Sequence, residues 1–166
     1  MSMQLIPRES IAERLSVVPA SLSADTVEDT PWWTGHQPSE DFECNISKIL
    51  PDAPSWSKEL RIWGMKGGNT ISVFYRDETV SEVEEIGIRF DASKLSNDFV
   101  LRVCRWAAGL QCVFVERVFM ANEYPLIEPD YFAVHEAIMK SRAMQFAKDP
   151  NAVLKDLKIN EFEQRR

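Results

Sequence analysis

The strongest constraint on the fold lies between residues 60 and 91, where apolar and polar side chains alternate in three successive segments. Around the glycine-rich segment MKGGN, the alternating apolar residues are Leu60, Ile62, Ile71, Val73 and Tyr75. Because a strand places successive side chains on opposite faces, this pattern predicts two strands joined by a turn, which is a β-hairpin. Gly67 and Gly68 supply the positive φ that such a turn needs.

The glycines of this turn are not typical of a phosphate-binding loop. A P-loop ends in Gly-Lys-Ser/Thr and leads into a helix, whereas Gly68 is followed by Asn69 and a predicted strand. A dinucleotide-binding fingerprint also opens a helix directly after its glycines. We therefore expect no cofactor here or elsewhere in the chain.

Two more strands are predicted after the hairpin. In SEVEEIGIRFD, Ile86, Ile88 and Phe90 face one way while charged residues face the other. The short polar connection RDETVSE predicts that this strand pairs antiparallel with the one before it. The continuous apolar run CVFV at 112–115 predicts an interior strand.

Helical spacing begins near residue 97. Ser96 or Asn97 is a candidate cap for a helix over 97–109, and Phe99, Val103 and Trp106 form its apolar face. Further helices are expected in the C-terminal third, after Pro129 and again after Asp149.

The N-terminal third shows weaker patterns. A short helix is expected at 8–15, followed by an irregular arm, so that residues 1–30 lie outside a single domain over 31–157. Alternation of Phe42, Cys44 and Ile46 predicts a short strand. A charged tail covers 158–166. These patterns together predict an α+β fold, with an antiparallel sheet of four to five strands packed by helices on one face.

Charge and cysteine content narrow the function. The formal net charge of -7 argues against nucleic-acid binding, because neutralising phosphates needs clustered basic residues.

Three cysteines without a CxxC spacing fit a reduced cytoplasm. The opening MSMQLIPRES resembles no signal peptide, and no run approaches the ~18 apolar residues of a membrane helix. We therefore expect a cytoplasmic protein without a membrane partner.

The chain offers few groups for catalysis. His36 and Cys44 do not have a zinc-ligand spacing, and no second pair completes four ligands, so no metal site is expected. His135 lies among apolar neighbours, while Cys104 and Cys112 sit in apolar runs that predict inert thiols. We predict no catalytic residues, although the sequence leaves the question of enzymatic activity open.

The candidate binding residues are aromatic and acidic. Large aromatic side chains dominate both cores and interfaces, and core packing is favoured for Trp32 and Trp33. Glu82, Glu84 and Glu85 have two interpretations. They either form the solvent-facing side of a strand or attract a basic partner. The full candidate set is Trp32, Trp33, His36, Trp56, Trp63, Glu82, Glu84 and Glu85.

One resemblance adds to this reading. The hairpin, EEIGIRFDASKLSNDFVLRVCRWA, the short apolar strand and the closing SRAMQFAKDPNAVLKDL resemble immunity-type proteins, which are small bacterial partners of secreted toxins. The likeness covers roughly residues 55 to 157. It implies a protein that binds and occludes another protein, without catalytic residues.

Two functions remain open from the sequence. The first is a non-catalytic interaction protein, such as an immunity-type inhibitor, whose partner is another protein. The acidic net charge is compatible with a basic partner. The second is a small-molecule-binding protein or enzyme with an aromatic-lined cleft near His36. Concavity distinguishes them, because a ligand site encloses its residues whereas an inhibitor presents them on a flat or convex face. A homodimer is compatible with either function.

Overall fold

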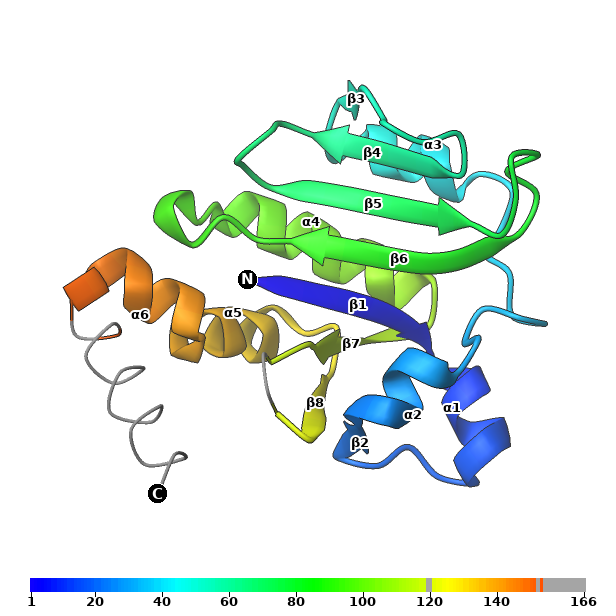
Figure 1. Cartoon of the computed structure of the whole chain (residues 1–166), viewed down its shortest axis with the longest axis horizontal. Coiled ribbons are helices and arrows are strands. Elements are labelled where there is room, and N and C mark those ends of the chain that lie inside the picture. The colour runs from blue at the N-terminus through cyan, green and yellow to red at the C-terminus, as the bar shows by residue number, and fades with distance from the viewer. Residues whose placement is uncertain (119–120, 152, 154–166) are drawn as a thin grey trace, which may run out of the picture.

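The computed structural model describes residues 1–118, 121–151 and 153. Within these residues, one antiparallel sheet of eight strands runs in the order β2-β8-β7-β1-β6-β5-β4-β3 (Figure 1). The strands are β1 (Ser2–Pro7), β2 (Ser21–Ser23), β3 (Asp52–Ala53), β4 (Leu60–Gly64), β5 (Thr70–Tyr75), β6 (Val83–Arg89), β7 (Cys112–Glu116) and β8 (Glu123–Ile127). The predicted α+β class is confirmed, and the sheet is larger than the four to five strands expected.

Helices cover much of one face of the sheet. They are α1 (Arg8–Leu15), α2 (Ala24–Asp29), α3 (Phe42–Ser47), the 3-10 turn η1 (Ala92–Lys94), α4 (Asn97–Gly109), α5 (Tyr131–Lys140) and α6 (Arg142–Lys148). In Figure 1, α3 and α4 lie behind the strands, and α5 packs against α4. The front of β4, β5, β6 and β1 is not covered by any helix of the described residues. We call this front the open face.

The strands and the helix predicted between residues 60 and 115 are confirmed. The hairpin is β4 and β5, and β6 pairs antiparallel with β5. The Ser96 hydroxyl caps α4 by accepting the Phe99 N–H at 3.3 Å. Phe99 is buried, as are Val103 and Trp106, and its ring meets Phe90 edge-on. The strand at 112–115 is β7, and its residues from Cys112 to Val115 are buried.

The strand predicted from Phe42, Cys44 and Ile46 is wrong, because this segment is helix α3. Phe42 and Ile46 lie one helical turn apart and are both buried, whereas Cys44 is exposed. Apolar residues at every second position of so short a segment fit a strand or a helix. Phe42 and Ile46 lie on one face in both structures. Only Cys44 distinguishes them, because a strand would put it on that same face and a helix puts it on the opposite one.

The N-terminal segment differs most from its expectation. The predicted helix at 8–15 is confirmed as α1. However, residues 2–7 form β1, which lies between β6 and β7 at the centre of the sheet, and residues 21–29 form β2 and α2 rather than an irregular arm. β1 is buried on both faces from Met3 to Pro7, so it shows no alternation that a sequence pattern could reveal.

The helix expected after Pro129 is present, but it is divided at Ser141 into α5 and α6, a break that the sequence did not predict. The Asp130 carboxylate accepts the N–H groups of Phe132 and Ala133 at the start of α5. A second cap at Ser141, which accepts the Met144 N–H at 3.2 Å, separates α6 from α5. The helix expected after Asp149 falls largely outside the described residues, as does the tail at 158–166.

The register of the central strands defines the two faces of the sheet. Leu5 pairs with Ile86, and Ile86 with Val73; these three buried side chains share one face. Alternation places the next positions on the other face. The open face at the sheet centre therefore carries Gln4, Gly87 and Ser72.

Candidate functional site

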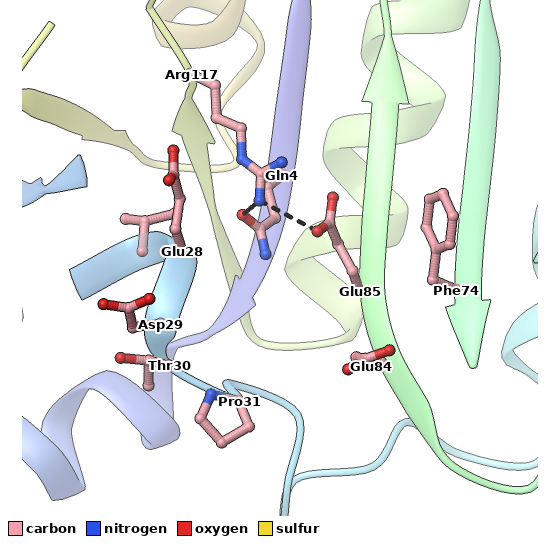
Figure 2. A pocket seen from close by; sticks show the side chains of 10 residues that line it. Gln4, Glu28, Asp29, Thr30, Pro31, Phe74, Glu84, Glu85 and Arg117 are labelled. Atoms are coloured by element: carbon pink, nitrogen blue, oxygen red, sulfur yellow. Dashed lines mark hydrogen bonds and ion pairs between the residues drawn. The ribbon is translucent and has the colours of Figure 1, made fainter. Parts of the chain in front are cut away.

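A hollow of about 650 Å³ lies on the open face, between the C-terminal end of α2 and the strands β5 and β6 (Figure 2). In Figure 2 its side chains lie in front of the sheet, and α4 lies behind it. Its charged lining residues are Glu28, Asp29, Glu84, Glu85 and Arg117. Four carboxylates thus face a single guanidinium, and the hollow favours a cation.

A β-bulge places two neighbouring carboxylates on the same side of β6. Phe74 pairs with Glu85, whereas the next residue, Tyr75, pairs with Val83, so Glu84 is an extra residue in the ladder. In a regular strand Glu84 and Glu85 would point to opposite faces. A bulge interrupts the alternation and re-aims a side chain. Both carboxylates therefore line the hollow.

The side chain of Gln37 stabilises this bulge. Its amide oxygen accepts the Val83 N–H at 2.6 Å, and its amide nitrogen donates to the carbonyl oxygens of Val83 and Trp33 at 3.0 and 2.6 Å. β1 pairs with β6 only from Ile86 onward, so the backbone of Val83 lies beyond the ladder on that side. The Gln37 amide satisfies both backbone groups as a neighbouring strand would.

The opposite wall of the hollow comes from the end of α2. Glu28 and Asp29 are the last two residues of this helix, whose last turn contains no basic residue. The Tyr124 hydroxyl donates to Glu28 at 3.3 Å. Burial of this hydroxyl, together with the Glu28 carboxylate, raises the pKa of Tyr124.

Gln4 and Arg117 form the inner end of the hollow. Arg117 Nη2 donates to the Gln4 amide oxygen at 2.8 Å and forms an ion pair with Glu85 at 3.1 Å. Gln4 is only 4% exposed. The nitrogen of its side-chain amide points away from Arg117 toward the hollow (Figure 2). This nitrogen has no hydrogen-bond partner among the described residues. It is a donor available to a ligand.

A second hollow of about 200 Å³ adjoins the first across the open face, because Gln4, Glu85 and Arg117 line both. Its floor includes Ser72 and Gly87. A Cβ atom at Gly87 would lie 2.8 Å from the Ser72 hydroxyl oxygen, so only glycine leaves the serine in place. The small side chains of Ser72 and Gly87 therefore leave this part of the open face recessed.

The structure buries three of the four candidate tryptophans. Trp32, Trp33 and Trp63 are at most 3% exposed, which confirms the core packing favoured for the first two. Their indole N–H groups bond to different elements: the Val27 carbonyl of α2, the Leu5 carbonyl of β1 and the Ser47 hydroxyl of α3. Trp63 also contributes to the wall of a separate hollow of about 340 Å³ beside α3. Trp56 is 80% exposed.

The four tryptophans therefore do not gather around one cleft near His36. The His36 ring lies against α1, where Nε2 is 3.1 Å from the Glu13 carboxylate and Nδ1 is 3.8 Å from Glu9. Its position is explained by these two contacts and by its backbone bond to Trp33. Aromatic residues near one another in the sequence anchor different parts of the core.

The three candidate glutamates separate into two groups. Glu84 and Glu85 line the hollow, whereas Glu82 forms an ion pair with Arg76 at 2.6 Å outside it. The residues that sequence reasoning missed are Gln4, Glu28, Asp29 and Arg117. A polar residue inside the apolar run of residues 3–7, and two acidic residues at a helix end, are signals that could have identified most of them.

Other reactive groups lie apart from this hollow. Burial raises the pKa of the Cys104 and Cys112 thiols to about 12, which agrees with the predicted inert cysteines. In the described ranges, no group of three histidine, cysteine or acidic residues is arranged to hold a metal ion. Nor does any helix in the part of the chain described have the length and apolarity needed to cross a membrane.

Comparison with known proteins identifies no relative, because no family model, curated protein or solved structure matches the chain.

Proposed function

We propose that this chain is a non-catalytic interaction protein of the immunity type, which binds another protein through the open face of its sheet and occludes it. The observation that carries the proposal is the open face itself, on which the acidic hollow adjoins the second, smaller hollow around Gly87. The face spans several strands and contains a donor, carboxylates and a guanidinium in a single surface. The hollow is a recess in an otherwise open face of several strands, and it is the breadth and mixed polarity of that face, not the recess, that suit a protein partner.

Charge supports a basic partner. The chain has a net charge of -7, and the hollow concentrates four carboxylates against one guanidinium. Complementary charge accelerates association and selects against partners of the same sign. A bacterial cytoplasm, where the partner is made before secretion, is the setting that the resemblance implies.

The small-molecule alternative loses its structural basis. It depended on tryptophans around a cleft near His36, and three of these tryptophans are core residues. The remaining one, Trp56, is exposed in the segment before β4. We therefore propose protein binding rather than an aromatic ligand site.

The test places a bulky side chain on the open face. The chain is co-expressed with the product of the neighbouring reading frame, and affinity is measured for the wild type and for Ser72→Tyr. A tyrosine on β5 opposite Gly87 is compatible with the sheet, because aromatic residues pack over cross-strand glycines. Ala108→Tyr on the exposed surface of α4 is the matched control.

We expect the wild type and Ala108→Tyr to bind the partner and inhibit its activity. Ser72→Tyr is expected to weaken binding at least about tenfold, equivalent to ~1.4 kcal/mol. Equal binding by the two variants would show that the partner does not use the open face. Absence of binding to the co-expressed product would contradict the proposed function for that pair.

A further inference from the structure

We draw no further inference here: the strongest candidate, the cluster of aromatic rings that Tyr131, Phe132 and His135 form on the first turns of α5, with Phe132 77% exposed, is a surface patch for which nothing in the structure shows what covers it.

Discussion

At the residue scale, Asp25 and Asp29 carry the same charge at opposite ends of α2. Asp25 lies in the first turn, where free N–H groups favour a carboxylate, and Asp29 is the last residue, where free carbonyl oxygens oppose it. We predict that Asp25→Asn destabilises the protein by about 0.3–1 kcal/mol and that Asp29→Asn stabilises it by a similar amount. Urea unfolding of both variants measures the two free energies.

Each variant is the control for the other, because both remove one negative charge from the same helix. If net charge alone determined stability, both variants would shift the unfolding free energy in the same direction. That result would contradict the explanation of the two effects by the free backbone groups at the helix ends.

At the element scale, the β-bulge of β6 depends on a side chain from a distant loop. Gln37→Ala removes the three hydrogen bonds through which Gln37 holds Val83 and Trp33. We predict a loss of about 1 kcal/mol in the free energy of unfolding, because three part-buried hydrogen bonds to the backbone are lost. Hydrogen exchange at the Val83 amide should accelerate more than at Ile86.

The matched control for this prediction is Gln145→Ala. Gln145 also donates to a backbone carbonyl, that of Lys140, but on the surface. Its removal should change stability by less than about 0.5 kcal/mol. Equal losses for the two glutamines would mean that the bulge holds itself in place without Gln37.

Elements with one buried face were predictable from the sequence. β5 and β6 alternate because one face packs on helices and the other is open, and α4 has both a cap and an apolar stripe. β1 was missed because both of its faces are buried. α3 is too short for its period to be distinguished.

The site was only partly predictable for related reasons. Glu84 and Glu85 could be named as exposed carboxylates, but the bulge that puts them on one side depends on the pairing of β6 with β5. Asp29 and Gln4 reach the hollow from segments that are remote in sequence. Only the order of the strands brings these residues together, and no local pattern encodes that order.

At the scale of the whole molecule, the N-terminal segment is an integral part of the sheet. A chain that begins at residue 31, the boundary expected from sequence, lacks β1 and leaves β6 and β7 without a common neighbour. We predict that this chain shows no cooperative thermal transition, because the buried face of the sheet would be split. Calorimetry or near-ultraviolet circular dichroism measures the transition.

The point variant Leu5→Asp tests the same dependence without shortening the chain. Leu5 is fully buried between its partners Ile86 and Phe114. An unpaired charge at this position should be as disruptive as the truncation. A cooperative transition in the truncated chain would instead identify residues 1–30 as an appendage of an independent domain.

The position of β1 also shapes how the protein is made. β1 precedes both of its neighbours, since β6 begins at Val83 and β7 ends at Glu116. Translation adds about 5–20 residues per second, so the apolar side chains of β1 wait roughly several seconds beside the ribosome for their partners. During that interval an unpaired strand is exposed to aggregation. The length of this exposure is set by the order of the strands in the gene, whatever the stability of the finished sheet.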